Sequence, residues 1–252
     1  MNKKIIISVI LCIVCIMSLS VKSLAYKLDT DDKSNSDEMS FYKKENRSSN
    51  KADLFKNIIK ATNGKIIEYG IMAEFNNSDS REKTVNELFK KLNENNNLVK
   101  KSSSNSESYS IEFHGNSIDG NIQSTGYSNH NIVKVDIVKQ DNKYSLYKLN
   151  SNLDSILKDY NTKIIYYKYI KVKIENNNIN GAYNKVIKCL KDIGDSNIKT
   201  ETLENGYTST TYTGQYEKIY SAGKPVDFNF SVVHYSTGTY IIMGTPEIIE
   251  TY

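Results

Sequence analysis

The sequence has no tryptophan, only two prolines and only three cysteines in 252 residues. Two of the cysteines, Cys12 and Cys15, fall in an apolar run near the N-terminus, so Cys189 is the single thiol in the rest of the chain. One thiol cannot form an internal disulfide, and a hydrophobic core must therefore hold the fold together. A folded part of about 200 residues is large enough to bury such a core.

The first 25 residues have the order of regions that is typical of a secretory signal peptide. Two lysines precede an apolar run at residues 5–19, and small residues follow up to Ala25. The run is shorter than the roughly 20 residues that a membrane span needs. We therefore predict cleavage between Ala25 and Tyr26, which removes residues 1–25 and leaves no integral membrane span. The alternative is an uncleaved anchor helix.

Arginine is scarce, and this argues against a nucleic-acid partner. The formal net charge is +4, from 33 basic and 29 acidic residues, but Lys3, Lys4 and Lys22 lie in the predicted signal peptide. The remaining 30 basic and 29 acidic residues give a net charge of +1. Binding to phosphates needs a positive surface. Proteins that contact base edges or narrow grooves rely on arginine, and the chain has only Arg47 and Arg81.

Recognised catalytic and metal-binding motifs are missing from the sequence after residue 25. There is no Gly-x-Ser-x-Gly elbow, no phosphate-binding glycine loop, no His-Glu-x-x-His and no Cys-x-x-Cys. His114, His130 and His234 lack the close spacing of a metal site, and no local motif activates Cys189 as a nucleophile. We therefore predict a protein that is not an enzyme and that has no catalytic residues, metal or cofactor.

Residues 26–50 are rich in charged residues, serine and asparagine and contain almost no branched aliphatic side chains. Such a segment cannot offset its ordering entropy by burying apolar surface, so we predict a disordered tether. The predicted organisation is a signal peptide at 1–25, the tether at 26–50, and two folded modules at 51–145 and 146–252.

One apolar pattern occurs twice in the chain. "NGKIIEYGIMAEF" begins at Asn63, and "NTKIIYYKYIKVKI" begins 98 residues later at Asn161. Apolar residues at helical spacing precede and follow each copy. Ile71 and its match Ile170 lie 99 residues apart, and one inserted residue predicts a β-bulge in the second copy. The alternative is a chance match in a chain rich in lysine and isoleucine.

Each half continues with short strands separated by glycine and asparagine turns. The predicted fold class is therefore α+β, with two similar modules formed by tandem duplication. Each module has the order helix, strand, helix and antiparallel meander, with the helices packed on one face of its sheet.

Tyrosine is the abundant aromatic residue, with 19 copies against seven phenylalanines. Tyr207, Tyr212 and Tyr216 occur in a polar stretch rich in threonine and serine. A tyrosine ring with its hydroxyl suits stacking on sugars or a protein interface, so these three are the candidate ligand-binding residues. The alternative is ordinary strand chemistry, because tyrosine and threonine favour half-buried pleated surfaces.

Three segments carry a resemblance to a known protein family. They are "ATNGKIIEYGI" from Ala61, "VNELFKKL" from Val85 and "GTYIIMGTPEIIETY" from Gly238. An exported chain with these segments resembles the YwmB family of Gram-positive bacteria. The resemblance implies a fold similar to that of the TATA-box binding protein and an exported or envelope-associated location. It implies no established activity and no functional residues. The second copy of the strand has Lys168 where the first has Gly70, which departs from two-fold symmetry.

The abundance of lysine, asparagine and isoleucine is typical of an AT-rich genome and, with the signal peptide, indicates a Gram-positive bacterium. We expect an exported, non-enzymatic protein of the cell envelope or the medium that binds a cell-wall polymer or another exported protein. The alternative is an envelope hydrolase, or a regulator of one, with an unrecognised site.

Overall fold

The structure is a computed structural model that describes residues 53–94, 96–142, 145–175 and 178–249. The predicted signal peptide, its cleavage site between Ala25 and Tyr26, and the tether at 26–50 lie outside these residues. Helices and strands follow one another in the order α3 (Leu54–Thr62), β1 (Lys65–Asn77), α4 (Arg81–Asn93), β2 (Val99–Ser104), β3 (Ser108–His114), β4 (Ile118–Gly126), β5 (Asn131–Lys139), α5 (Leu146–Leu157), β6 (Ile164–Ile174), α6 (Ile179–Asp192), β7 (Lys199–Leu203), β8 (Gly206–Thr211), β9 (Ile219–Ser221), β10 (Lys224–Val226), β11 (Phe228–Tyr235) and β12 (Gly238–Thr245).

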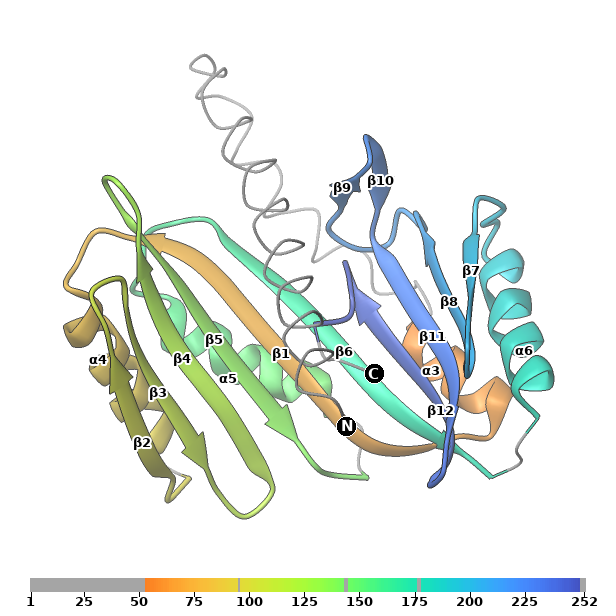
Figure 1. Cartoon of the computed structure of the whole chain (residues 1–252), viewed down its shortest axis with the longest axis horizontal. Helices are drawn as coiled ribbons and strands as arrows, with labels where there is room; N and C mark the ends of the chain where they lie inside the picture. The colour runs from red at the N-terminus through yellow and green to blue at the C-terminus, as the bar shows by residue number, and fades with distance from the viewer. Residues whose placement is uncertain (1–52, 95, 143–144, 176–177, 250–252) are drawn as a thin grey trace, which may run out of the picture. The chain divides into compact units, whose positions relative to one another are not determined.

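Ten of the described strands form one antiparallel sheet in the order β2-β3-β4-β5-β1-β6-β12-β11-β8-β7 (Figure 1). The two long strands β1 and β6 pair at its centre, with Gly70 opposite Tyr169. This pairing joins the first half of the fold (53–142) to the second half (145–249) in one sheet. The predicted α+β class is confirmed, and β9 and β10 form a separate hairpin.

A β-bulge interrupts the pairing of the two central strands. Ile66 pairs with Val172 and Glu68 pairs with Lys171, so Ile67 is the extra residue. The sequence pattern put the bulge in the second copy of the strand, and this detail is wrong because the extra residue lies in β1. A one-residue change of alternation between two copies fits an extra residue in either of them, and only the pairing of the strands distinguishes the two cases.

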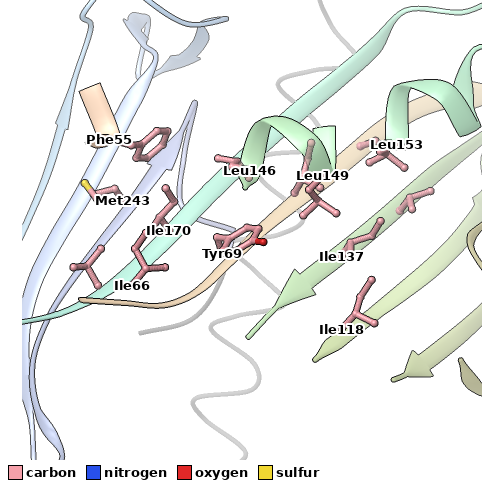
Figure 2. Packing of buried hydrophobic residues seen from close by; sticks show 14 of the residues in the cluster. Phe55, Ile66, Tyr69, Ile118, Ile137, Leu146, Leu149, Leu153, Ile170 and Met243 are labelled. Carbon is pink, nitrogen blue, oxygen red and sulfur yellow. The ribbon is translucent and has the colours of Figure 1, made fainter. Parts of the chain in front are cut away.

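A hydrophobic core joins the four described helices to the sheet. Figure 2 shows the part of it in which Phe55 of α3 and three leucines of α5 lie against the strands. Each helix has an apolar stripe at helical spacing, and the strands contribute alternate residues such as Ile71, Ala73 and Phe75. The buried helix residues include Leu54, Ile58, Val85, Leu88, Leu149, Leu153, Val186 and Leu190. None of the helices among the described residues is long and apolar enough to cross a bilayer.

The first helix of the first half packs against the second half. Helix α3 contacts α6 and β6, and the Phe55 ring centroid lies 5.8 Å from that of Phe228 and 6.0 Å from that of Tyr216. The first helix of the second half makes the reciprocal contact, because α5 packs on β1 and Tyr160 beyond it lies 4.8 Å from Phe75. Tyr69 of β1 also hydrogen-bonds Ser145, the N-cap residue of α5. The two halves are therefore interlocked through α3 and α5, whereas α4 packs on β3 and β4 of its own half.

Candidate functional site

A surface groove lies where the turn between β7 and β8 meets the N-terminus of α6, and we call it the α6 groove. Its volume is about 610 Å³. The residues that line it include Asn180 of the helix, Glu204 and Asn205 of the turn, Tyr207 of β8 and His234 of β11. The α6 groove thus contains Tyr207, one of the three tyrosines predicted to bind a ligand.

Backbone contacts fix the β7–β8 turn against β11. Leu203 pairs with Gly206, which leaves Glu204 and Asn205 as the two turn residues. The His234 N–H donates to the Asn205 carbonyl at 2.9 Å, and the Asn205 side-chain amide donates to the His234 carbonyl at 3.3 Å. Gly206 is required, because a Cβ atom there would lie 2.0 Å from the Val232 carbonyl oxygen.

A hydrogen bond and a ring contact orient the Tyr207 side chain. Its hydroxyl donates to the Asn180 side-chain oxygen at 2.8 Å, and its ring centroid lies 4.8 Å from that of Tyr183 on α6. The Tyr183 hydroxyl in turn hydrogen-bonds the Thr200 hydroxyl at 2.6 Å. A ligand that enters the α6 groove therefore meets an aromatic ring that is already oriented, which lowers the entropy cost of binding.

The chemistry of the α6 groove suits an uncharged ligand with many hydroxyl groups. Amide, imidazole and phenol groups can donate and accept hydrogen bonds, and Asn180, Asn205, Tyr207 and His234 supply them. Among the described residues that line the groove, Glu204 is the one carboxylate and none is a lysine or an arginine. Sugars present hydroxyls to such groups and C–H faces to aromatic rings.

Tyr212 lies on a different part of the surface. Its side chain is 42% exposed and Tyr220 is 52% exposed, with Lys218 between them. The Lys218 ammonium lies 5.9 Å from the Tyr212 ring centroid and 5.3 Å from that of Tyr220. We call these three residues the Tyr-Lys-Tyr cluster. The distances are those of cation–π contacts.

Tyr216, the third tyrosine predicted to bind a ligand, packs against the core. Its ring lies 6.0 Å from Phe55 and is stacked at 6.3 Å on Phe228. Desolvation by burial raises the pKa of its hydroxyl, as does the charge of Asp53. The structure therefore distributes Tyr207, Tyr212 and Tyr216 over three separate surroundings instead of gathering them in one site.

The residues considered for catalysis do not converge. His114 contacts Asp119 at 3.0 Å, His130 contacts Asn129 at 2.8 Å, and His234 contacts Thr239 at 3.0 Å. No group of three or more His, Cys, Asp or Glu side chains within the described ranges could hold a metal ion.

Cys189 packs partly buried against the core. Desolvation raises the pKa of its thiol, and the nearby Asp192 carboxylate raises it further. A nucleophilic cysteine needs the opposite shift.

The face of the sheet opposite the main core, which we call the second face, carries balanced charges. Glu68 pairs with Lys171 at 3.8 Å and Glu74 with Lys134 at 3.0 Å. The strand register places lysines and acids there in equal number. They are Lys65, Lys101, Lys134, Lys171, Lys173 and Lys199, and Glu68, Glu74, Glu112, Asp119, Asp136 and Glu201.

The chain reverses after β12 and returns over the second face. A Cβ atom on Gly244 would lie 2.5 Å from the Glu247 carbonyl oxygen. Desolvation raises the pKa of the Glu247 carboxyl, the Lys134 ammonium opposes that shift, and the Glu74 carboxylate adds to it. Desolvation also raises the pKa of Tyr167, with the charges of Glu74 and Glu247 next in effect. These groups form a crowded polar region, but they surround no described pocket.

Sequence reasoning missed Asn180 and Lys218, and it considered His234 only as a metal ligand. Asn180 and His234 become neighbours of Tyr207 only when α6 and β11 pack beside β8, so no local pattern indicates them. Lys218 did have a local signal, because it lies between Tyr216 and Tyr220 in the tyrosine-rich stretch.

No protein-family model matches the chain, and no characterised protein has a significantly similar sequence.

Proposed function

We propose that this chain is an exported, non-enzymatic binding protein of the cell envelope and that its α6 groove binds the sugar hydroxyls of a wall polymer. The observation that carries the proposal is the oriented Tyr207 ring, hydrogen-bonded to Asn180 in a groove lined mainly by neutral polar groups. Export is inferred from the signal-like N-terminus, and the resemblance to the YwmB family supports the same location.

The charge balance of the second face supports the exclusion of nucleic acids from this proposal. A fold with a wide open sheet could in principle hold a duplex, but a phosphate backbone needs an excess of positive charge. The second face has as many acids as lysines, and Arg81, the single arginine among the described residues, donates to the Ser106 carbonyl near the edge of the sheet.

We also infer that the two halves arose by tandem duplication. The strand order is symmetric about the β1–β6 pair, because β5, β4, β3 and β2 follow β1 outward as β12, β11, β8 and β7 follow β6. A helix precedes and follows the first strand of each half. In this interpretation the four helices cover one face of the sheet, as the α+β arrangement predicts.

The test is cosedimentation of the full chain with isolated wall sacculi, together with calorimetric titration of soluble, uncharged sacculus fragments. Tyr207→Ala removes the ring and should weaken binding at least about tenfold, the effect of losing some 1.4 kcal/mol. Tyr207→Phe keeps the ring but loses the bond to Asn180, so its loss should be smaller. Tyr147→Ala is the matched control, because Tyr147 on α5 is 85% exposed.

Equal binding by the Tyr207→Ala and Tyr147→Ala proteins would contradict the assignment to the α6 groove. Release of soluble sugars from the sacculi would instead support the alternative of an envelope hydrolase. If neither binding nor release occurred, a partner protein would replace the wall polymer as the expected ligand.

A further inference from the structure

The second half contains an insertion that has no counterpart in the first half. The turn between β3 and β4 spans only residues 115–117, whereas residues 212–227 separate β8 from β11 and include the β9–β10 hairpin. Figure 1 shows this hairpin projecting beyond the end of the main sheet. The corresponding strands of the first half pair without such a hairpin. The insertion also carries Tyr216, which packs against Phe55 of α3.

Hydrogen bonds to one buried carboxylate hold the first part of the insertion in place. Asp227 is fully buried, and its carboxylate accepts four hydrogen bonds from one loop. The donors are the Thr213 N–H at 2.6 Å, the Thr213 hydroxyl at 3.0 Å, the Gln215 N–H at 3.0 Å and the Tyr216 N–H at 3.3 Å. This carboxylate fixes the loop that leads from Tyr212 towards Lys218.

The tip of the hairpin is also well defined. Ser221 pairs with Lys224 around a two-residue turn, in which Ala222 and Gly223 have φ values of 48° and 76°. Two positive φ values are typical of the tight turns that match the twist of a β-hairpin. Tyr220 is therefore held on a regular strand and not on a loose loop.

The Tyr-Lys-Tyr cluster lies on this insertion, and all three of its residues are exposed. Tyr212 and Tyr220 are among the few large apolar side chains that remain exposed in the described part of the chain. The side chain of the adjacent acid, Glu217, contacts Lys163 at 3.6 Å. Lys218 thus presents a positive charge between two aromatic rings.

We propose that the Tyr-Lys-Tyr cluster is a second ligand site, which binds the phosphodiester group of an anionic polyol phosphate polymer. A lysine ammonium binds phosphate oxygens as a point charge. The two exposed rings flank the ammonium, so the C–H groups on either side of a bound phosphodiester would lie beside aromatic side chains. The site is independent of the α6 groove, because the six residues of β8 that separate Tyr212 from the β7–β8 turn span about 20 Å.

The experiment titrates the full chain with poly(glycerol phosphate) and follows binding by calorimetry. Lys218→Gln removes the charge but keeps a long polar side chain, and it should weaken binding at least about tenfold, because a hydrogen bond to a charged group has about that effect. Lys218→Arg should retain most of the affinity. Lys224→Gln is the matched control, because Lys224 is an exposed lysine on the same hairpin and should change the affinity less than about twofold.

Two comparison polymers distinguish binding of the phosphodiester from binding of the polyol chain and from binding of any polyanion. Uncharged polyglycerol should not bind at this site, and polyglutamate should bind more weakly than poly(glycerol phosphate). The proposal is overturned if poly(glycerol phosphate) shows no saturable binding, if Lys218→Gln and Lys224→Gln weaken binding equally, or if polyglutamate binds as tightly. The Tyr207→Ala protein should bind poly(glycerol phosphate) normally, so the outcome at the α6 groove does not affect this test.

Discussion

Replacing Phe55 with alanine tests whether the two halves of this fold are stable only together. Phe55 belongs to α3 in the first half, but its ring packs against Tyr216 and Phe228 in the second half. The residue is 3% exposed. The substitution therefore removes a contact between the halves without changing either end of the sheet.

The size of the effect follows from the burial of the ring. Truncation of a buried phenylalanine to alanine costs about 3 to 5 kcal/mol, because transfer free energy is lost and a cavity remains. We expect a loss near the upper end of this range for Phe55→Ala, because Tyr216 and Phe228 are stacked on each other and both lose a neighbouring ring. A typical domain has about 5 to 15 kcal/mol of stability, so the loss is a large share of the total.

The assay is equilibrium unfolding in urea, followed by far-UV circular dichroism and by tyrosine fluorescence. We expect one transition for both signals, shifted to lower urea in Phe55→Ala with its slope unchanged. Tyr147→Ala, at an exposed position on α5, should change stability by less than about 0.5 kcal/mol. A loss below about 1 kcal/mol in Phe55→Ala, or two separate transitions in the unchanged chain, would refute the interlocked arrangement.

Two further predictions concern single side chains. Asp227→Ala should lower the free energy of unfolding by about 2 to 3 kcal/mol, because three backbone N–H groups lose their acceptor. Hydrogen exchange should accelerate at Thr213, Gln215 and Tyr216, and unchanged protection there would show that Asp227 does not organise the loop. Alkylation of Cys189 by iodoacetamide should have a pH midpoint above the ordinary thiol pKa of 9.0, because desolvation raises the pKa of this thiol. A midpoint below that value would indicate an activated cysteine instead.

Much of the secondary structure can be predicted from the spacing of apolar residues in the sequence. The stripe Phe55, Ile58, Ile59 predicts a helix that the structure has as α3. The alternation Ile67, Tyr69, Ile71, Ala73, Phe75 predicts the buried positions of β1, and it is wrong at Ile67, where the bulge buries Ile66 instead. Both patterns are local, because a helix repeats every 3.6 residues and a strand every two. The pairing of distant strands leaves no such pattern among neighbouring residues. The sequence therefore predicts the bulge in the second copy, whereas the structure has it at Ile67 of β1.

The candidate sites too could be predicted only in part from the sequence. Tyrosine abundance by itself indicated Tyr207 and Tyr212 as ligand-binding candidates, and it indicated Tyr216 equally, although that ring packs on Phe228. Only the tertiary structure decided which tyrosine lines a groove, which lies on a projecting hairpin and which joins the core. Composition and periodicity are properties of neighbouring residues, whereas the bond from Tyr207 to Asn180 and the four bonds to Asp227 exist only after distant segments pack together.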